Sequence, residues 1–321
     1  MTRAEDRIIA IEEHFMYEGL TDHFPPGVRK QPPHILDRLY DLTEQRLKLM
    51  DDAGITMQVL SHQSPSAQRL DSSDAPEICR DTNDFLYKVI QDHPHRFAGF
   101  ATLPTTAGGE ASAAELRRSV EELGMRGGMI HGPSGGVFVD DPEFRPLFAQ
   151  AQSLGVPIYL HPAKPDAEVS KRYYAPYDQT HPAILQAAWG FGIETGTQGV
   201  RMILSGVFDE LPELQIILGH LGEAIPFWLD RADEGFARPN NRPSRFAEVF
   251  RSNFHVTTSG FFSDRALDCT LDAIGLDRVM FAVDYPYADG EKAMQWMREH
   301  PMPQEDKKAI LSGNARRLLK L

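Results

Sequence analysis

Short runs of apolar and β-branched residues recur along the whole chain, separated by stretches with helical spacing. Eight runs have the length of a strand that is buried on both faces: RIIAIEEHF, TMQVLSH, RFAGFATL, GGMIHG, VPIYLHP, LQIILGHLGE, FHVTTSG and RVMFAVDYP. Between them, apolar residues follow helical spacing in residues 36–53, 76–92, 110–123, 143–154 and 264–274. Strands that alternate with helices in this way predict a parallel sheet.

This alternation predicts an α/β fold. Eight strand–helix units within 321 residues favour closure into one (β/α)8 TIM-type barrel domain over residues 1–321, with a doubly wound open sheet as the alternative. Insertions follow the first predicted strand, at residues 17–33, and the fifth, at residues 162–182. Both lie beyond the carboxyl end of a strand, where barrel enzymes build their active sites.

The composition excludes several other classes of protein. The chain has 33 Lys and Arg against 46 Asp and Glu, and its net charge of −13 argues against binding to nucleic acid or to anionic membranes. No apolar run is long enough to cross a membrane, and the charged N-terminus does not resemble a signal peptide. Cys79 and Cys269 are too few for a disulfide framework or a thiolate zinc site. We therefore expect a cytoplasmic protein.

Side chains that can bind a metal fall at the carboxyl ends of four predicted strands. Glu12 and His14 end the first strand, and the fifth, sixth and eighth strands end with His161, His220 and Asp284. Residues two apart on a strand face the same side, so Glu12 and His14 can reach a common ion. Each of these residues alone is more commonly an ordinary polar residue, but their joint placement favours a metal centre. Mixed nitrogen and oxygen ligands suit zinc or manganese.

One metal ion is favoured over two. Two-metal sites of this architecture need a bridging group, often a modified lysine on the fourth strand, and that strand here reads Gly128, Met129, Ile130 and His131. His131 is a candidate pocket residue or, equally, an ordinary buried histidine.

Several motifs give the chain a family resemblance. The stretches AIEEHF, VPIYLHP, GVFDELPELQIILGHLGE, NFHVTTSG, FAVDYPY and GNARRLLKL span nearly its whole length. With them the chain resembles the amidohydrolase superfamily, and within it the metal-dependent non-oxidative decarboxylases. It resembles the γ-resorcylate and 2,3-dihydroxybenzoate decarboxylases and, more distantly, aminocarboxymuconate-semialdehyde decarboxylase.

The resemblance implies a TIM-type barrel with one divalent metal ion, zinc or manganese, and a small aromatic carboxylic acid as substrate. The metal ligands of the family fall on Glu12, His14, His161 and Asp284. The resemblance further implies catalytic roles for His220 and Glu223 and substrate-binding roles for Phe24, Arg231 and His220. Homodimers or homotetramers are also implied.

The aromatic residues Trp189, Phe191 and Trp228 could anchor such an interface. Their helical surroundings, however, favour positions in the core.

The implied reaction is the decarboxylation of an ortho-hydroxybenzoate, in either direction. An acid protonates the ring carbon that bears the carboxylate, and loss of CO2 restores the ring. Asp284 is the candidate proton donor, or only a ligand. His220 orients the substrate, and Glu223 holds its imidazole or serves only as a carboxylate at a helix N-terminus.

The competing hypothesis is hydrolysis of an amide, ester or lactone, with the same aspartate as the base that activates water. The first-strand sequence Glu-Glu-His-Phe favours decarboxylation over hydrolysis, and a binding protein without activity is disfavoured by the complete set of ligands. Resorcylate-type enzymes carry Asp-Trp-Pro-Phe-Glu near the last strand, whereas this chain has Tyr285, Tyr287 and Ala288 there. The identity of the hydroxybenzoate therefore stays open.

Overall fold

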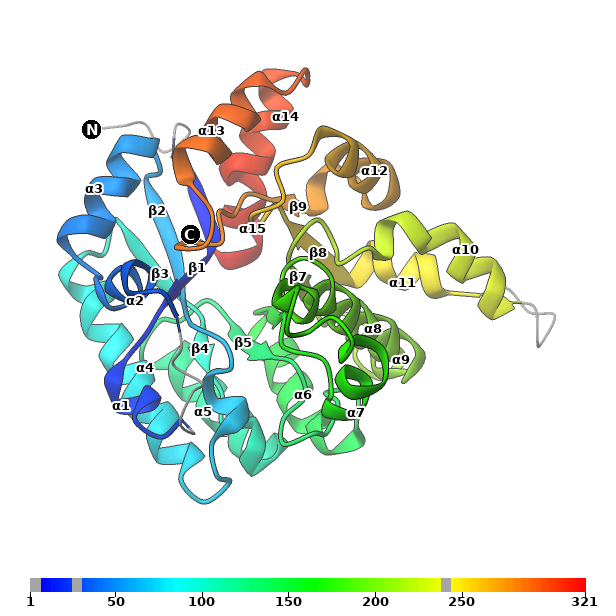
Figure 1. The fold of residues 1–321 in the computed structure, drawn as a ribbon, viewed down its shortest axis with the longest axis horizontal. Coiled ribbons are helices and arrows are strands. Elements are labelled where there is room, and N and C mark those ends of the chain that lie inside the picture. Colours follow the sequence, from blue (N-terminus) through cyan, green and yellow to red (C-terminus); the bar gives the residue numbers. More distant parts are fainter. Residues whose placement is uncertain (1–6, 25–30, 238–243) are drawn as a thin grey trace.

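Parallel strands occupy the centre of the molecule and helices surround them (Figure 1). The structure is a computed structural model and describes residues 7–24, 31–237 and 244–321. The strands are β1 (Ile9–Phe15), β2 (Met57–His62), β3 (Phe97–Gly99), β4 (Ala101–Thr102), β5 (Gly128–His131), β6 (Ile158–His161), β7 (Ile216–Leu218), β8 (Phe254–Thr257) and β9 (Val279–Met280). All eight predicted strands are confirmed, and the third is divided into β3 and β4.

The strands close into a barrel through two irregular seams. Regular pairing joins β1 to β3 in one sheet and β4 to β9 in another. At the first seam, Phe100 donates its backbone N–H to Leu60 of β2, and the chain then pairs with β5. At the second seam, the N–H of Ile11 reaches the carbonyl of Phe281 at 3.2 Å, and the N–H of Asp284 reaches that of Glu12 at 3.1 Å. The predicted TIM-type barrel is therefore confirmed.

Helices cover the outside of the barrel. They are α1 (Glu18–Thr21), α2 (Pro33–Tyr40), α3 (Glu44–Ala53), α4 (Ala75–Asp92), α5 (Gly109–Glu121), α6 (Arg145–Leu154), α7 (Ala167–Val169), α8 (Gly190–Leu204), α9 (Val207–Glu210), α10 (Ile225–Ala237), α11 (Phe246–Asn253), α12 (Asp264–Ile274), α13 (Gly290–Glu299), α14 (Gln304–Lys308) and α15 (Asn314–Leu319). Four of the five predicted helical stretches are confirmed.

The remaining prediction, one helix over residues 36–53, is wrong, because the helical conformation is interrupted between α2 and α3. Asp41 ends α2 in an extended conformation. Its carboxylate accepts hydrogen bonds from the backbone N–H groups of Thr43 at 2.8 Å and Gln45 at 2.7 Å. A carboxylate that binds these free N–H groups starts a new helix instead of continuing the old one.

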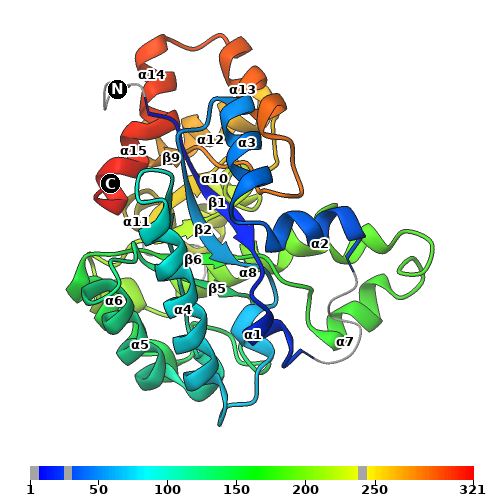
Figure 2. The same ribbon diagram turned by 90° about the vertical axis from the view of Figure 1, so that its left-hand side faces the viewer.

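The insertions lie where the sequence predicts them. The first holds α1, and its residues 25–30 lie outside the described part of the chain. The second contains α7, and Figure 2 shows α2 and α7 projecting from the same side of the barrel. No helix within the described residues is long and apolar enough to span a membrane.

The prediction that the tryptophans belong to the core is wrong. Trp189 is 56% exposed and Trp228 is 58% exposed, while Phe191 is half-buried. On α10, the face with Ile225 and Leu229 packs inward, so the position of Trp228 on the helix turns its side chain to the outside.

Candidate metal centre

An irregularity in β1 brings Glu12 and His14 to the mouth of the barrel. Ala10 pairs with Gln58 of β2, and Glu13 pairs with Leu60. Three steps along β1 thus match two steps along β2, so β1 carries one extra residue. Ile11 packs in the same apolar cluster as Tyr159, and the next residue, Glu12, also contacts Tyr159. The extra residue therefore shifts the alternation of side chains along the strand.

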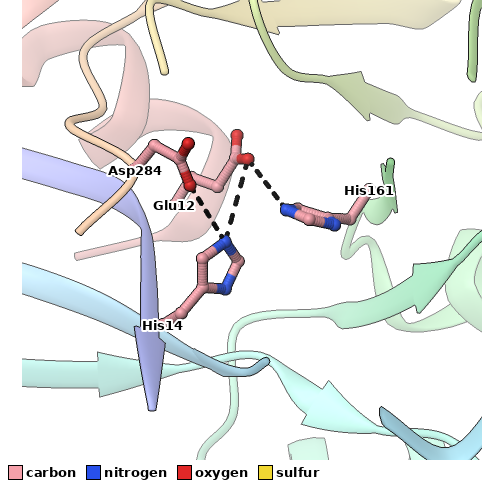
Figure 3. Close-up of side chains that lie close together, drawn as sticks. All are labelled: Glu12, His14, His161 and Asp284. Carbon is pink, nitrogen blue, oxygen red and sulfur yellow. Dashed lines mark ion pairs between the residues drawn. The ribbon is translucent and has the colours of Figure 1, made fainter. Parts of the chain in front are cut away.

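Four side chains from three parts of the barrel meet at this mouth (Figure 3). Each of Glu12, His14, His161 and Asp284 offers one nitrogen or oxygen atom, and these atoms lie within 4.8 Å of one another. Nε2 of His161 lies 3.2 Å from Oε1 of Glu12, and Nε2 of His14 lies 3.3 Å from Oδ1 of Asp284. The structure thus brings together the four residues on which the family ligands fall.

The chemistry of these atoms fits a divalent metal ion. Glu12 and His14 are fully buried, yet Oε1 of Glu12 and Nε2 of His14 lack a hydrogen-bond partner. Buried polar atoms are rarely left without partners, because such burial costs free energy. Two imidazole nitrogens and two carboxylate oxygens around one point are ligands that zinc and manganese accept.

The second ring nitrogen of each histidine has a partner of its own. Nδ1 of His161 lies 2.8 Å from the carbonyl oxygen of Pro162 and 2.9 Å from Nδ1 of His131. Nδ1 of His14 lies 3.2 Å from Oγ of Ser61. A proton on Nδ1 leaves the lone pair of Nε2 free for a metal ion, so these contacts favour the ligating tautomers.

His131 is therefore part of the site. Its ring is buried, and its centroid lies 4.6 Å from that of His161 and 6.4 Å from that of His14. Burial, and then the nearby rings of His161 and His14, hold the pKa of His131 well below its usual value. Of the two interpretations that the sequence left open, the structure favours the pocket residue.

His220 and Glu223 lie beside the four residues. Nδ1 of His220 is 2.8 Å from Oε1 of Glu223, and Nε2 of His220 is 3.8 Å from Oδ2 of Asp284. His220, Glu223 and Asp284 all have positive φ angles, of 47°, 52° and 70°. Such angles are uncommon outside glycine and concentrate at functional sites.

Charges within the site oppose the effect of burial on the pKa values of Glu12, Asp284 and His220. Burial raises the pKa of Glu12 and of Asp284, but neighbouring histidines outweigh it and hold both pKa values below their usual range. Burial lowers the pKa of His220, but Glu223, Glu12 and Asp284 raise it well above its usual value. The carboxylates of Glu12 and Asp284 therefore favour the charged form of the His220 ring.

Two further residues with expected roles lie away from the four. Phe24 is buried in a satellite cluster, and its ring centroid lies 6.4 Å from that of His62, the last residue of β2. Arg231 is exposed on α10 and has no hydrogen bond or ion pair with the four residues among those that the structure describes.

The sequence analysis missed three buried hydroxyls that contact Glu12. Tyr159, Thr257 and Ser259 all reach Oε2 of Glu12. The period of two along a strand could have found Tyr159, which stands two residues before His161 on β6. Thr257 and Ser259 have the same spacing at the end of β8.

A buried hydrogen-bond network connects β1 and β2 near the site. Arg46 is fully buried and donates to the carbonyl oxygen of His14 at 2.5 Å and to Oε1 of Gln58 at 3.3 Å. Its guanidinium carbon lies 4.3 Å from the ring centroid of Tyr285. Gln58 also donates to Glu13, whose pKa burial raises to about 8.

Known proteins resemble this chain over its full length. The family model described as Amidohydrolase matches residues 21–321. A gamma-resorcylate decarboxylase from Rhizobium sp. (strain MTP-10005) is 38% identical over 329 residues, which cover 98% of each chain. The crystal structure of a 2,6-dihydroxybenzoate decarboxylase complexed with 2,6-dihydroxybenzoate has a TM-score of 0.89 and 36% identity, with coverage of 98% of this chain and 100% of that one.

A second solved structure bears on the metal. It is a dihydroxybenzoic acid decarboxylase from Polaromonas sp. JS666 with bound manganese and the inhibitor 2-nitroresorcinol, and its TM-score is 0.89 at 36% identity, covering 98% of this chain and 97% of that one. These relatives are decarboxylases, which favours decarboxylation over the hydrolase alternative. The match over residues 21–321, together with full-length relatives above 30% identity, shows that this chain belongs to the amidohydrolase family.

Proposed function

We propose that this protein catalyses the non-oxidative decarboxylation of an ortho-hydroxybenzoate-type aromatic acid with one divalent metal ion. The observation that carries the proposal is the convergence of Glu12, His14, His161 and Asp284 at the mouth of the barrel. The relatives that share the fold over nearly the full chain support the reaction type.

The four converging residues would hold zinc or manganese. When bound, the ion supplies positive charge that anchors and polarises the carboxylate and ortho hydroxyl of the substrate. The reaction itself needs no oxidant: one proton adds to the ring carbon, the bond from that carbon to the carboxylate breaks, and its electron pair restores the aromatic ring as CO2 leaves.

Asp284 is the proposed donor of that proton. Its pKa is held below the usual range despite burial, because the neighbouring His14 and His220 favour its ionised form. The free protein therefore holds Asp284 ionised, and the proton must arrive with the substrate or from solvent before the transfer to carbon. A donor within reach of the ring carbon is what general acid catalysis requires.

His220 is the proposed contact for the substrate anion. The carboxylates around it favour its imidazolium form, and Glu223 holds the ring by Nδ1. The opposite ring nitrogen is left to face Asp284 and an incoming substrate. A fixed cation here would orient the acid and attract its negative charge.

Substrate selection is assigned to the rim of the site. Phe24 lies beside His62 at the mouth, and Tyr287 lies with its ring centroid 6.3 Å from that of His14. Small dihydroxybenzoates are the first candidates, because solved relatives are named for them.

Self-association as a homodimer or homotetramer belongs to the same proposal. Phe227, 77% exposed, and Trp228 lie together on α10 with Arg231 one turn further along. Aromatic and arginine side chains are enriched in the centres of protein interfaces. We further infer one barrel domain over residues 1–321 and, from two free cysteines, a cytoplasmic location.

The test combines metal analysis with product analysis. Protein loaded with zinc or manganese is incubated with a panel of hydroxybenzoates, and CO2 release is measured. Asp284→Asn should abolish turnover while much of the metal remains, whereas His14→Ala and His161→Ala should lose metal and activity together. Asp272→Asn, an exposed change on α12, is the matched control.

Decarboxylation by Asp284→Asn at the wild-type rate would refute the proton-donor role. Full metal occupancy in both histidine variants would refute the ligand assignment. Incorporation of water into an ester or lactone, with no CO2 from any acid of the panel, would overturn the proposed function in favour of hydrolysis.

A further inference from the structure

Three hydroxyl groups surround one carboxylate oxygen of Glu12, and the other oxygen has no hydrogen-bond partner. Tyr159 from β6, Thr257 from β8 and Ser259 just beyond β8 all contact Oε2, and all three side chains are fully buried. Oε1, by contrast, has no hydrogen-bond partner and lies 3.2 Å from Nε2 of His161. The two oxygens of one carboxylate therefore have different surroundings.

The hydroxyls also contact one another. Tyr159 lies 2.9 Å from Oγ1 of Thr257 and 3.5 Å from Oγ of Ser259, and Thr257 and Ser259 are hydrogen-bonded. Each hydroxyl has one proton to donate and can accept as well. Tyr159 and Ser259 can both donate to Glu12, while Thr257, 3.3 Å from Oε2, can donate its single proton to one of the neighbouring oxygens.

Gly219 leaves the space that this arrangement needs. A Cβ at this position, just beyond β7, would lie 2.9 Å from Oε2 of Glu12 and 3.3 Å from the hydroxyl of Tyr159. Either contact is closer than a methyl group normally tolerates. Residues from β1, β6, β8 and the end of β7 thus enclose a single carboxylate oxygen.

We propose that Tyr159, Thr257 and Ser259 form a hydroxyl clamp that positions Glu12 to bind the metal ion through Oε1 alone, with Gly219 providing the room. The clamp residues are positioning residues, because they act through Glu12 and do not touch the ion. The inference rests on the metal site of the proposed function but not on the identity of the substrate.

The physical reason is the number of lone pairs and the rigidity of the barrel. Oε2 is saturated by its hydrogen bonds and has little capacity left for a metal ion. Donors fixed on strands also prevent rotation of the carboxylate, which lowers the entropy lost when the ion binds. Partners that orient a ligand typically contribute about 10–100-fold in metal affinity.

The experiment measures Mn²⁺ binding by electron paramagnetic resonance, in which free and bound ions are distinguished. Tyr159→Phe and Ser259→Ala should each weaken binding about 10–100-fold. Thr257→Val should have a smaller effect, and Thr257→Ser, which keeps the hydroxyl, should bind like the wild type. The spectrum of bound Mn²⁺ should change in Tyr159→Phe, since Glu12 becomes free to rotate.

Matched controls separate positioning from loss of structure. Thr82→Val removes a fully buried hydroxyl from α4, and Tyr87→Phe alters a half-buried tyrosine on the same helix. Neither should change Mn²⁺ affinity. Urea unfolding without metal checks that each clamp variant folds. If Tyr159→Phe does not fold, Thr257→Val and Ser259→Ala decide the question.

A double variant tests whether the residues act together. Gly219→Ala alone should weaken Mn²⁺ binding as Tyr159→Phe does, because its methyl group displaces the clamp. In Gly219→Ala/Tyr159→Phe the loss should be smaller than the product of the two single losses, since both act through Glu12.

The outcomes distinguish the clamp from the proposed function. If Glu12→Gln abolishes Mn²⁺ binding while folded Tyr159→Phe and Ser259→Ala bind normally, the clamp is refuted and the metal site stands. If Glu12→Gln binds Mn²⁺ like the wild type, both the clamp and the ligand assignment fail. Weak binding in the clamp variants of a protein that releases no CO2 supports the clamp and refutes only the decarboxylase function.

Discussion

Replacement of Arg46 by methionine should destabilise the protein strongly, although Arg46 contacts only the backbone of His14 among the four proposed metal ligands. The side chain is fully buried, and its donors reach carbonyl oxygens of His14 and Asp41 and the amide oxygen of Gln58. Burial lowers the pKa of Arg46 to about 10, so it is still charged at neutral pH. Methionine preserves much of the length of the side chain and removes every donor.

The magnitude follows from the groups left behind. Two buried acceptors, on His14 and Gln58, and one half-buried carbonyl oxygen, on Asp41, lose a donor at about 1–3 kcal/mol each, and removal of the buried charge offsets part of this cost. Loss of the charge opposite Glu13 adds little to this cost, because the pKa of Glu13, about 8, keeps most of its carboxyl group neutral at pH 7. A net loss of about 3–5 kcal/mol is expected, as for other broken buried charge networks.

The assay is urea unfolding at pH 7, followed by far-UV circular dichroism. With a slope of about 3 kcal/mol per molar urea, the midpoint should fall by about 1 M or more. Arg46→Lys should lose most of the same stability, because an ammonium group lacks the planar fork of donors. Arg245→Met, which removes exposed ion pairs, should leave the midpoint almost unchanged.

An Arg46→Met midpoint equal to that of the wild type would refute this reasoning. So would an Arg46→Lys protein as stable as the wild type, since the expected loss depends on fork geometry and not only on charge.

Three other predictions concern residues outside the four proposed metal ligands. Burial lowers the pKa of His255 to about 3, whereas the unfolded chain protonates this ring near pH 6.5. The free energy of unfolding should therefore be highest above pH 6.5 and should decline by up to about 5 kcal/mol as the pH falls toward 3. In urea unfolding at several pH values, His255→Gln should show a smaller decline. Cys79 is buried and its thiol pKa is raised, so Ellman's reagent should modify it only after denaturation, and rapid reaction of both thiols in the native protein would contradict this. In Gly196→Ala the new Cβ would lie 2.5 Å from the backbone oxygen of Glu223, so the melting temperature should fall, whereas Gly235→Ala has open space and should not lower it.

The sequence by itself determined the barrel and the region of its site. Apolar runs alternating with helical stretches are a local property, and eight of them leave few ways to bury all strands on both faces. Because the carboxyl ends of parallel strands share one end of a barrel, the sequence alone predicts that residues such as His14, His161 and Asp284 lie near one another.

Only the tertiary structure decided that Glu12 lies on the same side of β1 as Ile11. The spacing of two predicts that Glu12 and His14 share a face, but strict alternation from Ile9 and Ile11 places that face opposite to these apolar residues. The extra residue in β1 brings both Ile11 and Glu12 to Tyr159 and leaves Glu13 against Gln58. A bulge depends on how two strands pair, and a single strand does not encode it locally.

The same holds for contacts between distant segments. The exposure of Trp228 and Arg231 depends on which face of α10 meets the barrel, and the helical spacing of the sequence does not specify that face. Thr257 and Ser259 meet Glu12 from about 245 residues away, and neither has a local pattern that marks a metal site. Packing in three dimensions fixes such contacts, because each depends on the closure of the barrel as a whole.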